Sequence, residues 1–506
     1  MNSKPHIPPP ADGFLPTAVY FIGIGGIGMS ALARYYNYAG AVVAGYDRTP
    51  SPLTAALEAE GIDIHYEDDV EKIPPAFRAP EAPGGVSVIY TPAVPADHRE
   101  LNWFRQHGYP IIKRSKALGH IAAGKTTIAI AGTHGKTTIS TLTAHLLTEA
   151  GDGCTAFLGG VSKNYDSNLL LSASPALVAE ADEFDRSFLQ LFPQIAVVTS
   201  VDADHLDIYG TAGAMKQAYV DFIHQVQPGG AVILKQGVER LFGSAALRRP
   251  AAAAAVYHYA LTDAADFYAS DIRRLDSGLL RFDLHLPGGV IDDCVLGVPA
   301  RVNVENAVAA VAAVWAYAQC NQRDTNDFFA FADGLRRGLA SFTGVQRRFD
   351  VQVNTRRGTY IDDYAHHPAE LRAAITSLRE TFPGRKITGI FQPHLYSRTR
   401  DFADGFAESL SLLDALILLE IYPAREAPIP GVSARLIFDK VTLPQKQLCT
   451  KSNLLEVLQT KDIDVLVTFG AGDIDRLVEP LTRWMKRDER RKALSQCQIN
   501  YAERNS

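Results

Sequence analysis

The chain has 506 residues, of which 47% are hydrophobic and 21% charged, and its formal net charge at pH 7 is −6. The length predicts two to four domains, the composition is typical of folded globular proteins, and the negative balance disfavours a general nucleic-acid binder. The five cysteines are scattered without metal-type spacing, no stretch approaches the length of a membrane span, and the N-terminus lacks a secretion pattern. We therefore expect a cytoplasmic protein that binds neither nucleic acid nor membranes.

The chain opens with the pattern of a βαβ unit. An apolar strand at 18–22 leads into glycines and a helical stretch that reaches residue 38, and a second strand at 41–45 is followed by Asp47. Gly23, Gly25 and Gly28 fit the G-x-G-x-x-G fingerprint, in which the backbone approaches a pyrophosphate at a helix N-terminus. By itself this fingerprint is compatible with a nicotinamide-dependent dehydrogenase as well as with a UDP-sugar protein.

A phosphate-binding loop is predicted between a strand at 127–131 and a helix at 139–150. The loop consists of Gly132, Thr133, His134, Gly135, Lys136, Thr137 and Thr138. In this context Lys136 reaches the β/γ-phosphates of a nucleotide and the Thr137 hydroxyl reaches Mg²⁺. The spacing G-x-x-x-x-G-K-S/T occurs at 119–126, but a helix leads in and a strand leads out, so we discount it. A dehydrogenase has no use for Lys136, which disfavours nicotinamide binding at the N-terminal glycines.

Acidic residues follow two strands near this loop. A strand at 176–179 leads into Glu180 and further acids at 182, 183 and 185, and a strand at 195–201 leads into a segment that contains His205. The carboxyl ends of strands in open α/β sheets are where ligands bind. We therefore expect Glu180, His205 and Thr137 to hold Mg²⁺ or Mn²⁺ beside ATP.

The rest of the chain predicts further α/β structure. Antiparallel strands are expected at 266–298 and a helix at 303–318, and the pattern resets near 342–348. Later strands are expected at 359–361, 386–391, 415–419 and 465–469, with helices at 368–381 and 402–412 and a charged tail from 483. The fold prediction is α/β with three domains: Rossmann-like at 1–125, a P-loop ATPase with a mostly parallel sheet at 126–345, and Rossmann-like at 346–506.

Six motifs, in this order, resemble those of the Mur ligases of peptidoglycan synthesis. They are AGTHGKTT at 131–138, EADEFDRSFL at 180–189, DADHLDIYG at 202–210, DDYAHHPAE at 362–370, FQPHLYSRTRDF at 391–402 and YPAREAPIPG at 422–431. The N-terminal GIGGIGMS at 23–30 also matches, and the resemblance spans roughly residues 18–475.

The resemblance implies an ATP-dependent amide-bond ligase that uses Mg²⁺ or Mn²⁺. Its substrates would be UDP-N-acetylmuramate and L-alanine, joined through an acyl phosphate with release of ADP and phosphate. A ligase that attaches a recycled murein tripeptide to the same UDP-sugar remains open, since it would share every ATP residue. A ligase for diaminopimelate is disfavoured because its DNPR element is absent from the chain.

The resemblance also implies roles for individual residues. The UDP-sugar residues would be Gly23, Gly25, Gly26, Gly28, Met29, Ser30 and Asp47. Besides the phosphate loop, the ATP residues would be Asn303, Asn306, Arg348 and Asp363. The amino acid would be held by His367, His394 and Arg398. The catalytic residues would be Lys136, Glu180, His205, His367 and Arg398. The chain departs from the family pattern at Val302, where His is usual before the adenine pair, and at Leu395, where Arg is common.

Overall fold

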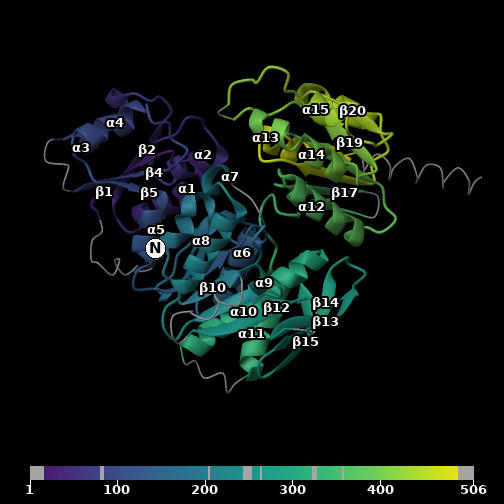
Figure 1. The fold of residues 1–506 in the computed structure, drawn as a ribbon, viewed down its shortest axis with the longest axis horizontal. Helices are drawn as coiled ribbons and strands as arrows, with labels where there is room; N and C mark the ends of the chain where they lie inside the picture. The colour runs from purple at the N-terminus through teal and green to yellow at the C-terminus, as the bar shows by residue number, and fades with distance from the viewer. Residues whose placement is uncertain are drawn as a thin grey trace, which may run out of the picture. The chain divides into compact units, whose positions relative to one another are not determined.

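The computed structural model describes residues 16–79, 85–202, 206–242, 254–261, 265–321, 328–355, 358–424 and 426–487. These residues form three α/β domains, each built around one β-sheet (Figure 1). The N-terminal and central domains together make one compact unit, and the chain from Val345 onwards makes a second. The predicted fold class is confirmed.

The N-terminal domain has a parallel sheet in the order β3-β2-β1-β4-β5. Its strands are β1 (Ala18–Ile22), β2 (Val42–Tyr46), β3 (Asp63–His65), β4 (Val86–Tyr90) and β5 (Ile111–Lys113). Its helices are α1 (Ile27–Tyr38), α2 (Pro52–Ala59), η1 (Val70–Lys72), α3 (Pro75–Arg78), α4 (Arg99–Gln106) and α5 (Arg114–Ala122). Strand β1 is central and almost wholly buried, as expected for a parallel strand covered on both faces. The glycine turn after β1 therefore lies at the carboxyl edge of the sheet.

The central domain has a ten-stranded sheet in the order β15-β14-β13-β12-β11-β10-β6-β9-β7-β8. Its strands are β6 (Thr126–Ala131), β7 (Thr155–Ser162), β8 (Ser167–Leu170), β9 (Ala176–Glu180), β10 (Ile195–Val198), β11 (Ala231–Lys235), β12 (Ala255–Ala260), β13 (Phe267–Arg274), β14 (Leu280–Leu286) and β15 (Gly289–Leu296). Its helices are α6 (Lys136–Glu149), η2 (Phe184–Gln190), α7 (Leu206–Tyr209), α8 (Ala212–His224), α9 (Glu239–Phe242), α10 (Arg301–Cys320) and α11 (Phe328–Ser341). The β13–β15 strands pair antiparallel as predicted.

Four strands of this sheet, β7, β8, β11 and β12, are not predicted from the sequence pattern. Strand β7 contains glycines that resemble a turn, but Gly159 has a packing reason: a Cβ there would lie 2.0 Å from Glu180 Oε2. Strand β10 ends at Val198, three residues before its predicted end. Directly after it, the Thr199 hydroxyl donates to the carbonyl of His134 in the phosphate loop, at 2.5 Å.

Helix α1 of the N-terminal domain packs against strands β7 and β8 of the central domain. The fully buried Asn168 donates from Nδ2 to the Ile27 carbonyl at 2.6 Å and to Ser30 Oγ at 2.9 Å. Arg34 Nη1 donates to Asn168 Oδ1 at 2.5 Å. Apolar side chains of both domains continue in one core around these bonds. The helix that begins at the glycine turn is therefore fixed to the domain that carries the phosphate loop.

The C-terminal domain has a six-stranded sheet in the order β16-β17-β21-β18-β19-β20. Its strands are β16 (Asp350–Asn354), β17 (Thr359–Asp363), β18 (Ile387–Phe391), β19 (Ala415–Leu418), β20 (Lys446–Leu448) and β21 (Val465–Phe469). Its helices are α12 (Pro368–Thr381), α13 (Tyr396–Asp401), α14 (Ala403–Leu410), α15 (Arg435–Phe438), η4 (Lys451–Asn453), α16 (Leu454–Gln459), η5 (Asp473–Leu477) and a final helix at 478–487. Only β16 is antiparallel to its neighbour. The helix predicted at 402–412 is α14, and the short helix α13 that precedes it is not predicted from the sequence.

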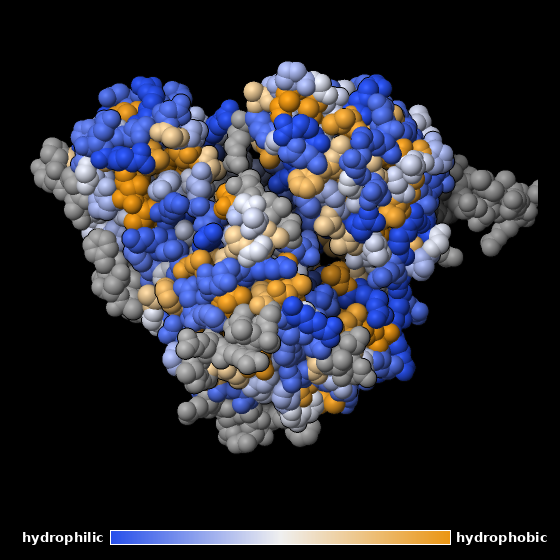
Figure 2. All heavy atoms as spheres, viewed as in Figure 1, coloured by the Kyte–Doolittle hydropathy of each residue, from blue (hydrophilic) through white to orange (hydrophobic). Residues whose placement is uncertain are grey.

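Hydrophilic side chains predominate on the face shown in Figure 2, and apolar ones are scattered over it. Among the described residues, no helix combines the length and the apolar character that crossing a membrane requires. The apolar residues instead fill the cores beside the three sheets.

Candidate active site

The phosphate loop joins β6 to α6, in the predicted order. Gly132 and Gly135 have φ angles of +127° and +80°, in the region that favours glycine. A Cβ on Gly132 would lie 2.0 Å from Thr199 Oγ1, so this position has no room for a side chain. Helix α6 begins at Lys136, where its unpaired N–H groups form an anion-binding end. The discounted match at 119–126 runs from within α5 into β6, as expected.

Lys136 is held by the carboxylate of Glu183, which the sequence does not single out. Its Nζ lies 2.9 Å from Glu183 Oε1 and 2.8 Å from Oε2, and it donates to the Gly132 carbonyl at 2.6 Å. The two side chains are 13% and 2% exposed. Burial lowers the pKa of Lys136, but the carboxylates of Glu183, Glu180 and Asp182 outweigh it and raise that pKa above its ordinary value. Lys136 is therefore a buried ammonium.

Glu180 ends β9 beside the phosphate loop, as predicted. Its backbone pairs with Ile130 of β6, and its Oε2 atom is buried with no hydrogen-bond partner among the described residues. Thr137 lies buried in the first turn of α6, and Thr138 follows it half-buried. A buried carboxylate oxygen without a donor is costly. The position therefore suits a cation.

The third predicted metal ligand, His205, lies outside the described residues. Within the described ranges, no group of three or more His, Cys, Asp or Glu side chains is arranged to hold a metal. A cation at Glu180 and Thr137 would therefore also need ligands from a bound phosphate or from His205.

Polar side chains after β10 hold the phosphate loop from the other side. Ser200 Oγ lies 2.7 Å from Thr133 Oγ1 and accepts from the His134 amide at 3.1 Å. Asp202 Oδ2 accepts from Thr133 Oγ1 at 3.1 Å and lies 3.2 Å from His134 Nε2. A hydrogen bond from His134 lowers the pKa of Asp202. Thr133 and His134 are thus bonded to the neighbouring strand end.

Asn303 and Asn306 lie in the first turns of α10, near the phosphate loop. Asn303 Nδ2 donates to the Pro299 carbonyl at 2.6 Å, and its Oδ1 accepts from Asn306 Nδ2 at 3.4 Å. A Cβ on Gly135 would lie 2.9 Å from Asn306 Oδ1. The structure therefore brings Asn306 against the phosphate loop.

The N-terminal glycine turn is closed by Asp47. Gly23 has a φ of +85°, and the Gly25 amide donates to Asp47 Oδ2 at 2.7 Å. Gly26 is exposed, whereas Met29 and Ser30 are 1% and 0% exposed. The side chains of Met29 and Ser30 thus pack inside the protein, and the exposed Gly26 offers its backbone at the surface.

In the C-terminal domain, Asp363 and Arg348 lie where the chain enters the sheet. Asp363 accepts from the amides of Phe349 and Ala365, both at 2.8 Å, and burial raises its pKa to about 6. The Arg348 guanidinium lies over the ring of Tyr364, 5.0 Å from its centre. Asp363 thus holds the backbone of the domain entrance in place.

Of the two adjacent histidines in the motif at 362–370, His366 contacts the ring of His394, and the predicted His367 contacts the ring of Phe402. The centres of the His366 and His394 rings are 6.1 Å apart. His367, which caps the start of α12, instead packs its ring 4.8 Å from that of Phe402. Burial lowers the pKa of His366, and the charge of Arg398 acts in the same direction. Arg398 Nη1 is buried with no hydrogen-bond partner among the described residues.

Comparison with known proteins decides the family. Models of the Mur ligase family catalytic domain, middle domain and glutamate ligase domain match residues 18–126, 130–314 and 347–472. A UDP-N-acetylmuramate–L-alanine ligase of Parabacteroides distasonis is 53% identical over 466 residues, which cover 92% of this chain and 96% of that one. The chain belongs to the Mur ligase family. A ligase of the same name from Porphyromonas gingivalis is 51% identical over 92% of this chain and 99% of its own.

Solved structures of Mur ligases share the fold of this Mur ligase. The UDP-N-acetylmuramate–alanine ligase MurC of Thermotoga maritima has a TM-score of 0.73 and 25% identity, over 93% of this chain and 99% of its own. A murein peptide ligase of Psychrobacter arcticus has a TM-score of 0.66 and 19% identity, over 92% and 98% of the two chains, which shows likeness of fold alone. Mur ligases use ATP, which agrees with the phosphate loop.

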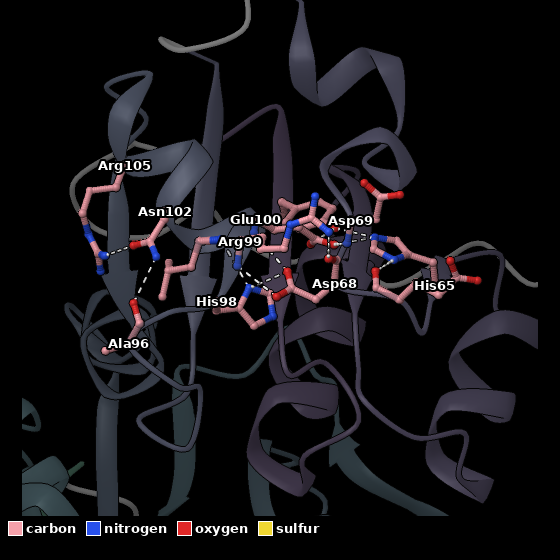
Figure 3. A network of polar contacts seen from close by, with 12 residues as sticks. His65, Asp68, Asp69, Ala96, His98, Arg99, Glu100, Asn102 and Arg105 are labelled. Atoms are coloured by element: carbon pink, nitrogen blue, oxygen red, sulfur yellow. Dashed lines mark hydrogen bonds and ion pairs between the residues drawn. The ribbon is translucent and has the colours of Figure 1, made fainter.

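The N-terminal domain of this Mur ligase also contains a buried polar network that the sequence does not predict (Figure 3). Tyr20 Oη lies 2.7 Å from both His65 Nε2 and Glu100 Oε2. His65 Nδ1 lies 2.9 Å from the Glu67 carbonyl, so it carries a proton. The Tyr20 hydroxyl donates to Glu100 Oε2, and His65 Nε2 also lies 3.4 Å from Glu100 Oε1. Burial raises the pKa of Glu100 to about 8, and the hydrogen bond from Tyr20 only partly opposes this rise.

The Glu100→Gln variant is expected to remove a pH dependence of stability. The folded chain keeps a proton on Glu100 that the unfolded chain has released above its ordinary pKa of 4.5, so stability falls as pH rises toward 8. Between pH 6.5 and 8, where unfolded His65 is also mostly neutral, the wild-type free energy of unfolding should fall relative to the variant by up to about 1.4 kcal/mol per pH unit. Urea unfolding at several pH values measures this difference, and a difference independent of pH would mean that folded Glu100 is ionised.

Proposed function

We propose that this Mur ligase joins L-alanine to the muramyl carboxyl group of UDP-N-acetylmuramate in peptidoglycan synthesis, with release of ADP and phosphate. The observation that carries this proposal is the 53% identity over 92% of the chain to a ligase of that name. The phosphate loop with the buried Lys136 ammonium supports it, because a carboxylate must be activated before an amine can attack it. Peptidoglycan precursors of this kind are cytoplasmic, so the enzyme acts in the cytoplasm.

Residues of the central domain would hold the nucleotide and its cation. ATP supplies the phosphoryl group that activates the muramyl carboxylate, and Mg²⁺ or Mn²⁺ neutralises its charge. Lys136 and the amides of 132–137 would bind the phosphates, and Thr137, Glu180 and His205 would hold the cation. The buried, unpartnered Oε2 of Glu180 fits this role. A phosphate at Lys136 would compete with the Glu183 carboxylate and the Gly132 carbonyl, both of which Lys136 Nζ contacts.

Residues of the C-terminal domain would hold the amino acid. Arg398 has a buried guanidinium nitrogen with no hydrogen-bond partner in the described part of the chain, which suits the carboxylate of L-alanine. The Glu426 carboxylate accepts from the Ser397 amide at 2.9 Å and from its hydroxyl, so the first turn of α13 is held in place. We assign His366, with His394 and His367, to the surroundings of the incoming amine.

Phosphate release from ATP tests the proposal. It is measured with UDP-N-acetylmuramate and, in turn, L-alanine, L-serine, glycine and the tripeptide L-Ala-γ-D-Glu-meso-diaminopimelate. We expect release that requires both the UDP-sugar and an amino acid, with L-alanine preferred. Preference for the tripeptide would assign the chain to murein recycling instead. Release independent of the UDP-sugar would exclude both functions.

The Gly159→Ala variant is expected to disturb the cation site without unfolding the sheet. The added methyl would lie 2.0 Å from Glu180 Oε2 and 2.4 Å from its carboxyl carbon, so the carboxylate must move. We expect the Mn²⁺ concentration for half-maximal ligation to rise about tenfold, from the weakened contact of one ligand. Gly160→Ala is the matched control in the same strand. Equal effects of the two variants would show that Gly159 acts on the strand alone.

A further inference from the structure

Arg114 lies between the two ligand-binding motifs of the first compact unit. It is the first residue of α5, directly after β5, at the carboxyl edge of the N-terminal sheet. A Cβ built on Gly28, in the first turn of α1, would lie 2.5 Å from Arg114 Nη1 and 3.2 Å from its Cδ. On the other side, Arg114 Nη2 donates to Asp182 Oδ2 at 3.1 Å. One guanidinium therefore contacts both the glycine turn and the acidic segment after β9.

The acidic segment also binds the ammonium group of Lys136 in the phosphate loop. Asp182 follows Glu180 by two residues and precedes Glu183, the partner of Lys136. Arg114 and Lys136 are thus bound to consecutive carboxylates, Asp182 and Glu183, of one short segment. An oxyanion that displaced Asp182 from Arg114 would lie beside the groups that bind ATP.

Gly28 has no conformational reason to be glycine. It lies within α1 and its φ is not positive, so alanine would favour the helix by about 1 kcal/mol. The space above it is instead filled by the guanidinium of Arg114. The Arg114–Asp182 pair is 24% and 35% exposed, and an ion pair of that exposure adds little stability. The planar, forked guanidinium is the side chain best matched to phosphate and carboxylate oxygens.

We propose that Arg114 binds an oxyanion of the UDP-sugar and directs the sugar from the glycine turn toward Glu180 and Lys136. Asp182 is its counter-ion in the structure, and the substrate oxyanion would take the place of that carboxylate. The oxyanion is a pyrophosphate oxygen or the muramyl carboxylate, which share the same chemistry. This inference rests on the proposed function, and it adds a substrate-binding residue that the sequence motifs do not contain.

Titration calorimetry of the full chain with UDP-N-acetylmuramate and with UDP-N-acetylglucosamine tests the proposal. The second ligand keeps the pyrophosphate and lacks the carboxylate. We expect Arg114→Ala to weaken UDP-N-acetylmuramate binding about 10- to 100-fold, the range for a lost charge-assisted bond. Lys113→Ala is the matched control, because Lys113 precedes Arg114 and pairs with Asp185 of the same segment at 2.8 Å. It should change binding less than about twofold.

Two further variants separate binding from a structural role. Asp182→Asn keeps the guanidinium and removes its counter-ion, so UDP-sugar binding should be unchanged or tighter. Gly28→Ala should displace the guanidinium and weaken binding while the melting temperature holds or rises. Weakening by Arg114→Ala for both UDP-sugars supports a pyrophosphate contact, and weakening for UDP-N-acetylmuramate alone supports a carboxylate contact.

Two outcomes would overturn the inference. One is an Arg114→Ala effect no larger than that of Lys113→Ala. The other is a loss of UDP-N-acetylmuramate affinity in Asp182→Asn as large as that in Arg114→Ala. That result would mean that Arg114 acts only by positioning Asp182. A wild-type chain that binds no UDP-N-acetylmuramate would refute the proposed function itself, independently of Arg114.

Discussion

Lys136→Met is expected to lower kcat for ATP-dependent ligation by at least about 10²–10³-fold, the cost of losing one donor to charge that develops in the reaction. The buried ammonium of Lys136 is the cation at the start of α6, where the helix end and the loop amides converge. Binding of UDP-N-acetylmuramate should stay within about twofold of the wild type, because the glycine turn makes no contact with Lys136 in the described structure. Phosphate release and titration calorimetry measure the two effects.

The ion pair with Glu183 provides the control for this prediction. Lys136→Met leaves a carboxylate that is 2% exposed without its cation, which by itself destabilises the central domain. The double variant Lys136→Met, Glu183→Gln removes that unpaired charge. We expect it to recover thermal stability and to remain inactive. Recovery of activity with stability would show that Lys136 serves the fold and not the reaction.

The acids at 180–185 show what a local motif can and cannot predict. The motif singled out Glu180 but did not predict the pairing of Glu183 with Lys136 or of Asp182 with Arg114. Three basic side chains each form an ion pair with a different acid of this segment. Lys136 pairs with Glu183, Arg114 with Asp182 and Lys113 with Asp185. Of these acids only Asp185 lies in η2, where it and Arg186 both adopt left-handed backbone angles. Strand ends and glycine spacing are visible in the sequence, whereas the partner of each carboxylate depends on cations that come from distant parts of the chain.

The C-terminal domain shows the same limit. The motif DDYAHHPAE predicts two adjacent histidines before a helix, and the structure separates their roles. His367 is the residue before Pro368, which favours an extended backbone, and its side chain caps α12 by accepting from the Ala369 amide at 3.4 Å. His366 therefore faces His394. Helix boundaries were predictable from Pro368, but the choice between the two rings required the packing against Phe402.

Arg347→Ala is expected to cost the C-terminal domain about 3–5 kcal/mol of unfolding free energy, the range for removing one partner of a buried ion pair. Arg347 Nε donates to Asp362 Oδ2 at 2.9 Å, and its Nη2 donates to the Gly470 carbonyl at 2.6 Å. Asp362 is fully buried, and its other oxygen accepts from Thr468 at 2.6 Å. Removing the guanidinium leaves the Asp362 charge inside the sheet, between β17 and β21.

Hydrogen exchange of the amides of β17 and β21 in the full chain measures this loss in the domain concerned. Arg372→Ala is the matched control, because Arg372 pairs with Glu408 at 3.2 Å on the surface of the same domain, where the two side chains are 50% and 71% exposed. It should change stability by less than about 1 kcal/mol. The double variant Arg347→Met, Asp362→Asn should recover much of the loss, since no charge is then left unpaired. The β17 and β21 amides of Arg347→Ala could exchange no faster than those of Arg372→Ala. Arg347 would then not be what keeps the Asp362 carboxylate in the core, and it would become a candidate for ligand binding instead.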